Sequence, residues 1–354
     1  MKGPHQIVLS ALVAVVFVGC SAQLGPRAVP QAQLDYNRAL VRSWDEQLLL
    51  NLVRLRYRDN PVFLQISSVL TKYSFDLGAG ISGSFDFDGN SDAGASGSVG
   101  YGENPTITYR PLQGDEFVES LLTPIRPTTL VLLSQSGWSI ERLLLCCVQR
   151  IDEVENAIAA AGPTPDYVPE YESFHRLAGL LRELQKRGMV RVSPTEEGEV
   201  RIRIQEDERT DEIRQLLGLG PETLDLRAVP EGSGASGPGD LVVGGRSLLA
   251  VMFFLSQAVE PPPAHREAGL VTRTLDPEGR PFDWSRVTGE VLRVRSAGRR
   301  PDRAAVAVRY RGHWFYIDDG DLNSKTTFSL LNYLFILKSG AKAGEEPLLT
   351  LGVG

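Results

Sequence analysis

The densest group of side chains able to do chemistry follows an apolar run near the end of the chain. Asp318, Asp319 and Asp321 stand between Trp314–Ile317, which reads as a strand, and a helix-like segment. Carboxylates gathered in this way can bind a divalent cation or act as general acids and bases. They do not fit an EF-hand, because Ser329 stands where a loop opened by Asp318 would need its closing glutamate. The alternative is a turn whose carboxylates cap the helix that follows.

No other pattern of residues indicates catalysis. His175, His265 and His313 each lack a second histidine or cysteine at metal-ligand spacing in the same predicted element. Residues 78–83 match the GxGxxG dinucleotide fingerprint, but strand-like alternation runs through them where that motif needs a helix to begin. We therefore predict that the chain is not an enzyme and that it holds no metal ion or cofactor.

Cys20 lies in a sequence that indicates covalent modification. It follows Lys2 and an apolar run at residues 7–18, and it ends the tetrad Phe17-Val18-Gly19-Cys20. The run is shorter than the roughly 20 apolar residues that span a bilayer, and it has the length of a signal-peptide core. The tetrad resembles the lipobox of bacterial lipoproteins, although Phe17 stands where leucine is usual. The alternative is an ordinary secretory signal with an incidental cysteine.

The resemblance to lipoproteins implies that residues 1–19 are removed as a signal peptide. It also implies that Cys20 then carries a diacylglycerol thioether and an acyl chain such as palmitate on its amino group. More than one acyl chain gives stable anchoring in a membrane. Ser21 stands where aspartate would favour the inner membrane, which implies an outer-membrane anchor facing the periplasm. Residues 20–34 show little periodicity and read as the lipidated tether.

Charge and the remaining cysteines set further bounds. A formal net charge of −7 argues against nucleic acid as a partner, because phosphate binding needs clustered lysine and arginine. Cys146 and Cys147 are neighbours in a predicted helix, where a disulfide between them would be strained. We therefore expect two free, buried thiols.

The longest regular pattern in the sequence begins at Tyr73. Over residues 73–87 the odd positions are mostly apolar and the even positions are small or acidic, and a second alternating run covers residues 93–101. The extended pattern then continues to Tyr109. We predict one long Gly/Ser-rich amphipathic β-hairpin over residues 73–109. The residues expected to contact a membrane or a partner are Tyr73, Phe75, Leu77, Ile81, Phe85, Phe87, Val99 and Tyr101.

The length of this hairpin is typical of membrane-spanning β-structure. Strands of globular proteins have about 5–6 residues, whereas transmembrane barrel strands have about 9–11 and carry aromatic residues near both interfaces. One hairpin cannot close a barrel, so several chains would each contribute one. In this layout the chain is similar to oligomeric pore lipoproteins such as the curli secretion channel, without a shared motif. Two alternatives stay open: an arm that packs on its own domain or a neighbouring subunit, and a disordered Gly/Ser-rich loop.

The rest of the chain mixes helical and strand patterns and predicts an α+β fold with antiparallel strands. The Gly/Ser-rich residues 230–240 read as a linker. They would separate a helical and β domain over residues 35–229 from an α+β C-terminal region over residues 241–354. Within these regions we expect one helical pattern that starts at Asp35, with Leu48, Leu49, Leu52 and Leu55 as its apolar stripe, and a helix over residues 171–187. We expect strands over residues 63–69, 189–192, 200–204, 287–294, 304–310 and 314–317.

These patterns lead to three alternative functions. The first is an outer-membrane lipoprotein that forms a homo-oligomeric envelope assembly or an export pore through its hairpin. The second is a soluble periplasmic accessory lipoprotein that binds a protein of an envelope machine with the same arm. The third is an enzyme of unknown reaction. Phrases at residues 43–51, 105–109 and 313–319 are similar to those of uncharacterised predicted lipoproteins of Gram-negative bacteria, which implies location and no activity.

Overall fold

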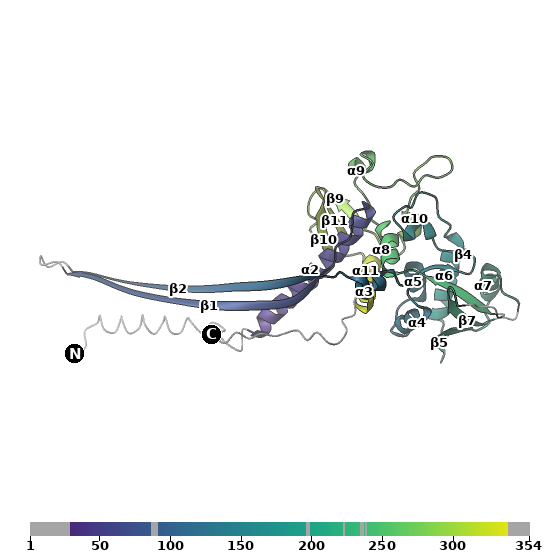
Figure 1. Ribbon diagram of the computed structural model, residues 1–354, viewed down its shortest axis with the longest axis horizontal. Coiled ribbons are helices and arrows are strands. Elements are labelled where there is room, and N and C mark those ends of the chain that lie inside the picture. The colour runs from purple at the N-terminus through teal and green to yellow at the C-terminus, as the bar shows by residue number, and fades with distance from the viewer. Residues whose placement is uncertain are drawn as a thin grey trace. The chain divides into compact units, whose positions relative to one another are not determined.

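The computed structural model gives the protein an α+β fold, which confirms the class predicted from the sequence. Figure 1 shows its helices and strands in chain order by colour. The structure describes residues 29–85, 91–195, 199–221, 224–233, 237 and 239–338. Among these, residues 29–33, 65–85, 91–107, 109 and 110 are described by their backbone alone.

The chain divides into two compact units that interleave along the sequence. Unit 1 comprises Met1–Asp59, Pro163–Val168 and Phe253–Asn332. Unit 2 comprises Asn60–Gly162, Pro169–Met252 and Tyr333–Gly354. These units differ from the expected regions 35–229 and 241–354, because the expected linker lies inside unit 2 and joins two strands of one sheet.

Unit 1 contains a long helix and a small antiparallel sheet. Helix α2 (Val29–Arg56) buries Leu48, Leu49 and Leu52, as their spacing predicts. It begins inside the expected tether rather than at Asp35, because a proline in the first helical turn gives up no intrahelical hydrogen bond. The sheet has the strand order β10-β11-β9. Its strands are β9 (Arg295–Ala297), β10 (Ala304–Tyr310) and β11 (His313–Asp318).

One expected strand of unit 1 is wrong. Residues 287–294 contain the end of helix α10 (Ser285–Thr288) and a turn instead of a strand. Val287, Val291 and Leu292 are all buried. Val291 and Leu292 follow the helix in a turn in which the N–H groups of both residues donate to the Thr288 carbonyl at 2.9 Å. A strand would place these two side chains on opposite faces. The other helices that contain residues of unit 1 are α8 (Leu248–Ser256), α9 (Pro263–Glu267) and α11 (Leu322–Lys338).

Unit 2 is built on a six-stranded sheet with the order β4-β3-β8-β7-β6-β5. The strands are β3 (Val148–Ile151), β4 (Val154–Glu155), β5 (Val190–Pro194), β6 (Val200–Ile204), β7 (Asp225–Pro230) and β8 (Asp240–Gly245). Helix α6 (Glu172–Lys186) and the antiparallel β5–β6 hairpin after it are confirmed. The other helices are α3 (Asp115–Leu122), α4 (Pro127–Gln135), α5 (Ile140–Cys147), α7 (Thr210–Leu217) and the 3-10 turn η1 (Ile158–Ala161).

The buried side chain of Asn156 closes the C-terminal end of helix α5. The helix passes directly into β3, so its last carbonyl groups need partners from outside the helix. The amide Nδ2 of Asn156 donates to the carbonyls of Leu144, Leu145 and Val148 at 3.4, 3.0 and 2.7 Å. One fully buried amide therefore bridges the helix end and the first residue of the strand.

Arg246, which follows β8, supplies the remaining partners. Its Nη1 donates to the carbonyls of Leu145 and Cys146 at 2.7 and 3.2 Å, and its Nη2 donates to the carbonyl of Asn156. Its backbone N–H donates to the carbonyl of Cys147 at 2.7 Å. Burial lowers the pKa of Arg246 to about 10, which leaves the guanidinium charged at neutral pH. Cys146 and Cys147 are free and buried, as predicted.

We predict that Asn156→Ala lowers the free energy of unfolding by about 2–3 kcal/mol, because it leaves buried carbonyls without a donor. Urea denaturation of the full chain measures this change. The matched control is Gln215→Ala, an amide at an exposed position of α7 in the same unit. An effect of Asn156→Ala within about 0.5 kcal/mol of that control would contradict this role for the amide.

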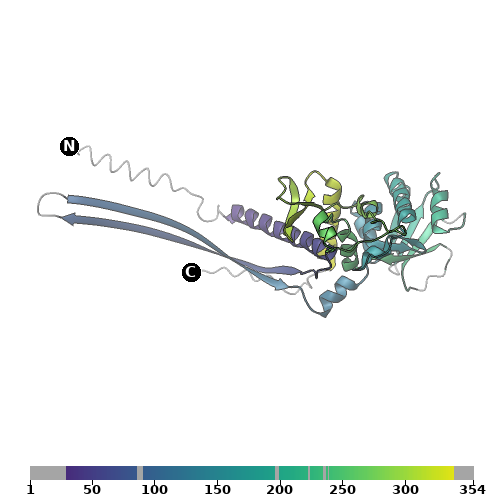
Figure 2. The same cartoon turned by 90° about the horizontal axis from the view of Figure 1, so that it is seen from above.

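Unit 2 also carries the expected hairpin, formed by β1 (Leu64–Phe85) and β2 (Ser91–Pro111). Figure 2 shows the two strands side by side along their whole length. Both strands extend beyond the predicted bounds of 73–109. Strand β1 starts earlier because the short strand expected at residues 63–69 continues into it without a break, and β2 continues to Pro111.

Candidate functional site

The β1–β2 hairpin is the main candidate for a functional surface. The two strands contain 22 and 21 residues and pair antiparallel from Leu64 opposite Pro111 to Phe85 opposite Ser91. One register shift, between Ile66 and Ser68, interrupts the ladder near its root. Beyond Ser68 the pairing is regular up to Phe85, so most of the hairpin is a continuous ribbon.

The register brings the expected contact positions to one face of this ribbon. Phe75 lies opposite Tyr101, and Leu77 lies opposite Val99. Directly opposite residues of an antiparallel pair share a face, and alternate residues of a strand do so too. Tyr73, Ile81 and Phe85 fall on the same face by this rule. The other face carries glycine, serine and aspartate positions, among them Asp76 opposite Gly100.

Both outer edges of the hairpin lack a partner strand within the described part of the chain. The two strands form a sheet of their own, with the order β1-β2. Each strand therefore has one row of backbone N–H and C=O groups that point away from its partner. Such edges pair readily with a strand from another chain.

The root of the hairpin is held by aromatic side chains of unit 2. Phe63 precedes β1 and is 7 % exposed, and its carbonyl accepts a hydrogen bond from the Leu112 N–H at 2.9 Å. The ring of Phe63 lies 5.7 Å from that of Phe117 on α3 and 5.1 Å from that of Phe335 on α11. The chain therefore enters and leaves the hairpin through one packed cluster.

Several expected features lie outside the described residues. Cys20, the signal sequence at residues 1–19 and Phe87 all lie outside them. Lipidation of Cys20 and membrane contact by Phe87 therefore stay predictions. No described helix has the length and apolar character needed to cross a bilayer.

The acidic cluster of β11 and α11 forms the capped turn that was one of its two interpretations. The Asp321 carboxylate accepts hydrogen bonds from the backbone N–H and the hydroxyl of Ser324 at 3.0 and 2.7 Å, which caps α11. Asp319 pairs with Lys325 at 2.6 Å, and Asp318 accepts a hydrogen bond from the Gly320 N–H at 2.9 Å. Over the residues that the structure describes, no three His, Cys, Asp or Glu side chains group as metal ligands.

The structure brings together two histidines that the sequence keeps apart. The rings of His265 and His313 lie 4.8 Å apart in an edge-to-face arrangement, and the Tyr57 hydroxyl lies 2.7 Å from His265 Nδ1. Burial, with the neighbouring His313 and Arg311, lowers the pKa of His265. No local spacing could reveal this cluster, because His265 and His313 come from α9 and β11.

Asp59 binds Tyr310 and Arg311, which lie next to the histidine cluster. Its carboxylate accepts hydrogen bonds from the Tyr310 hydroxyl and from Arg311, the latter at 3.0 Å. The guanidinium of Arg311 also lies 5.3 Å from the centre of the Tyr57 ring. The hydrogen bond from Tyr310 is the largest influence that lowers the pKa of Asp59, and Arg311 adds to it against the opposing effect of burial.

We predict that Asp59→Asn destabilises unit 1 near neutral pH and has less effect in acid. Because the folded state lowers the pKa of Asp59, its stabilisation is present above the unfolded pKa of about 3.9 and is lost as the pH falls through the folded value. Thermal unfolding at about pH 6 and about pH 3 measures the change. Asp302→Asn, at an exposed position of the same unit, is the control. A Tm difference from wild type that persists unchanged at the lower pH would contradict the prediction.

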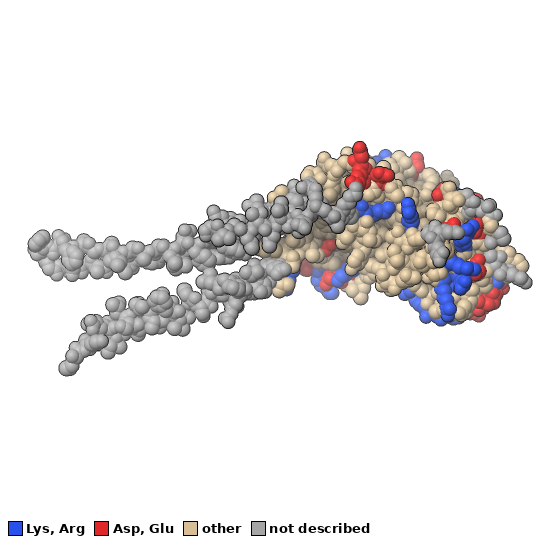
Figure 3. All heavy atoms as spheres, turned by 60° about the horizontal axis from the view of Figure 1, so that its bottom comes forward, with Lys and Arg blue, Asp and Glu red and all other residues tan. Residues whose placement is uncertain are grey.

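The arginines on β6 and β7 of unit 2 are matched by carboxylates. Arg201 binds Asp225 at 2.7 and 2.6 Å, and Arg227 binds Asp240 at 2.8 and 2.7 Å. Glu199 adds a further contact to Arg227 at 3.1 Å. In Figure 3 blue and red side chains accordingly interleave over the part of unit 2 that carries β5 and β7. This surface is a network of ion pairs rather than a basic patch.

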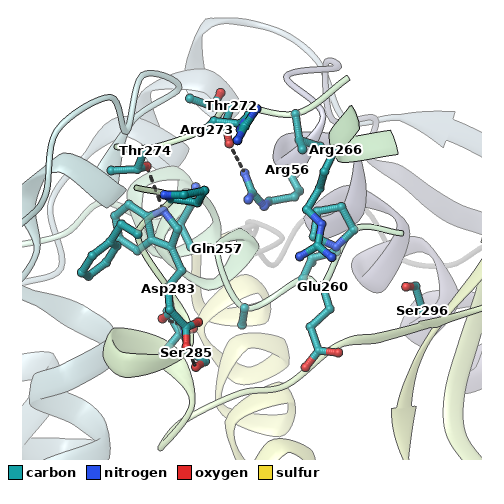
Figure 4. A pocket seen from close by; sticks show the side chains of 18 of the residues that line it. Arg56, Gln257, Glu260, Arg266, Thr272, Arg273, Thr274, Asp283, Ser285 and Ser296 are labelled. Atoms are coloured by element: carbon teal, nitrogen blue, oxygen red, sulfur yellow. Dashed lines mark hydrogen bonds between the residues drawn. The ribbon is translucent and has the colours of Figure 1, made fainter. Parts of the chain in front are cut away.

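Unit 1 contains a cavity of about 620 Å³ that no sequence pattern predicted. Its wall combines the end of α2 with segments around α9 and α10. Figure 4 shows Arg56 with its Nη1 donating to the Thr272 carbonyl at 3.5 Å. On another part of the wall, Trp284 Nε1 donates to the hydroxyl of Thr274 at 2.9 Å.

Comparison of the chain with models of protein families, with curated proteins and with solved structures finds no match.

Proposed function

We propose that the mature protein is an outer-membrane-anchored lipoprotein that assembles with copies of itself, and that the β1–β2 hairpins of the assembly form or line a pore. The observation that carries the proposal is the hairpin, with strands of 22 and 21 residues and no other partner strand among those described. Lipid on Cys20 would hold each copy at the bilayer on its periplasmic side.

The length of the hairpin supports this function. The regular ladder runs from Ser68 to Phe85 on β1, which corresponds to about 60 Å at about 3.3 Å per residue. A bilayer has a hydrocarbon core of about 30 Å, which a tilted strand crosses with about 9–11 residues. The hairpin is therefore long enough to cross the core and to extend beyond it.

The two faces and the two edges of the hairpin also suit a barrel built from several chains. Barrel strands alternate apolar residues toward lipid with polar residues toward the lumen. The face with Phe75, Leu77 and Ile81 would meet lipid, and the face with Ser82 and Asp76 would line the lumen. Closing a ring of hairpins pairs every outer edge, which a bilayer requires because unpaired backbone groups are costly in hydrocarbon.

The unpaired edges favour a second candidate function. A soluble accessory lipoprotein could add its hairpin to the sheet of a partner in an envelope machine, since backbone hydrogen bonds at an exposed edge bind an extended segment of another protein. In that case the hairpin would need a protein partner and no lipid.

We predict that Ile81→Asp abolishes pore formation and that Ser82→Asp does not. These neighbouring residues fall on opposite faces of β1, so both variants add the same charge to the same depth of the ribbon. A carboxylate on the lipid face is desolvated in every subunit, whereas one in the lumen stays hydrated. The measurement is release of an entrapped dye from phospholipid vesicles that contain the mature, acylated protein.

Two results would count against the pore. Equal dye release by Ile81→Asp and wild type would show that this face does not meet lipid. No release by wild type, with the hairpin cleaved by protease equally fast with and without vesicles, would favour the soluble accessory protein.

The lipid anchor has its own prediction. Cys20→Ser should abolish incorporation of radiolabelled palmitate and move the protein out of the outer-membrane fraction, because the thioether needs the thiol. Cys146→Ala is the control, since it removes a buried thiol and leaves Cys20 in place. Palmitate incorporation that survives in Cys20→Ser would overturn the anchoring at this residue.

A further inference from the structure

Arg56 is a buried cation with almost no partner. Arg56 is the last residue of helix α2, and its side chain lines the cavity of unit 1. The residue is only 8 % exposed. Its guanidinium donates to the Thr272 carbonyl at a long distance of 3.5 Å, and its Nε has no acceptor among the described residues. A guanidinium offers five N–H donors, and burying its charge without an anion is costly. Burial accordingly lowers the pKa of Arg56 to about 10.

The residues that line the cavity carry more positive than negative formal charge. Four arginines line it, and the three besides Arg56 stand at exposed positions: Arg266, Arg273 and Arg293. Within the described ranges, none of the four has a carboxylate oxygen within ion-pair distance. The carboxylates that line the cavity are three: Glu260, Glu267 and Asp283. Four formal positive charges and three formal negative charges leave one positive charge uncompensated.

Asp283 is already engaged and does not neutralise Arg56. One of its carboxylate oxygens accepts a hydrogen bond from the Ser285 N–H at 2.9 Å, and the other accepts one from the Ser285 hydroxyl at 2.8 Å. In Figure 4 the labelled Asp283 and Ser285 lie together, apart from the guanidinium of Arg56. The buried guanidinium of Arg56 is therefore available to an anion that enters the cavity.

The rest of the wall indicates the body of such a ligand. Trp284 is 6 % exposed, and its ring lies 5.3 Å from that of Phe282 in an edge-to-face arrangement. Val259 and Val271 add aliphatic surface to the same wall. The buried Gln257 contributes an oxygen, Oε1, that has no hydrogen-bond donor. An apolar wall with a few convergent polar groups is typical of a small-molecule site, and about 620 Å³ suits a small organic molecule.

We infer that this cavity binds a small organic monocarboxylate, with its carboxylate on Arg56 and its apolar body against Trp284 and Phe282. The single uncompensated charge favours a monoanion over a doubly charged phosphate ester. Gln257 Oε1 is placed to accept a hydrogen bond from a donor on the ligand. The inference is independent of the hairpin, so failure of either proposal leaves the other standing.

Thermal unfolding of the full chain with three aromatic probes tests this inference. Benzoate carries one carboxylate, benzamide has nearly the same shape without charge, and phenyl phosphate carries a second negative charge. We expect benzoate to raise the Tm in a concentration-dependent way, because it binds the folded state alone. Benzamide should have no such effect, and phenyl phosphate should need an at least roughly tenfold higher concentration.

The variant Arg56→Met isolates the role of the buried charge. It should weaken the benzoate effect at least about tenfold, since a charge-assisted bidentate pair is lost. Without a probe its Tm should not fall below that of wild type, because the substitution removes an unpartnered buried cation. The control is Arg280→Met, which removes an exposed arginine of the same unit that pairs with Asp276 outside the cavity lining.

Four results would overturn the inference. These are no effect of benzoate on wild type, equal effects of benzoate and benzamide, an unchanged benzoate effect in Arg56→Met, and tighter binding of phenyl phosphate than of benzoate. The comparison of benzoate with benzamide on wild type decides the matter even where the variant does not fold.

Discussion

This protein depends on one physical constraint, which is that backbone hydrogen-bonding groups need partners. Hairpin β1–β2 satisfies only the inner half of its groups, because no other described strand pairs with either of its edges. Water can satisfy the outer groups, but hydrocarbon cannot. A ribbon of this length that meets a bilayer therefore has to pair with further strands. Copies of the same chain supply strands of matching length and register, which is why the proposal couples membrane insertion to assembly.

The same constraint explains the interior of unit 2. Helix α5 runs into β3 without a turn, and the carbonyl groups at its end are satisfied by Asn156 and Arg246, which directly follow β4 and β8. These side chains tie the centre of the six-stranded sheet to the helix that covers it. Arg56 in unit 1 is the contrasting case, since it is nearly as deeply buried but has one long hydrogen bond. Arg246 has carbonyl acceptors for its guanidinium and is structural, whereas the few acceptors of Arg56 are the basis for proposing that it binds a ligand.

The sequence predicts regular elements well and long-range contacts poorly. The alternation after Tyr73 predicts the hairpin because its period of two is unbroken, but it does not show that the strand expected at residues 63–69 continues into the hairpin. The bulge between Ile66 and Ser68 shifts the parity of the pattern there, so the apolar positions do not continue on one face. Residues 287–294 were misassigned because a short apolar run fits a strand or a helical turn equally well. The His265–His313 cluster and the Arg56 cavity join residues far apart in the chain, and no local pattern contains that information.

Electron microscopy of the mature protein, extracted from outer membranes in detergent, tests the central claim most directly. The account predicts closed rings of subunits, with a detergent belt around the level of the hairpins. Monodisperse single chains without such a belt, at concentrations where the protein is intact and acylated, would contradict it. In that case the hairpin would be an arm for a different protein partner.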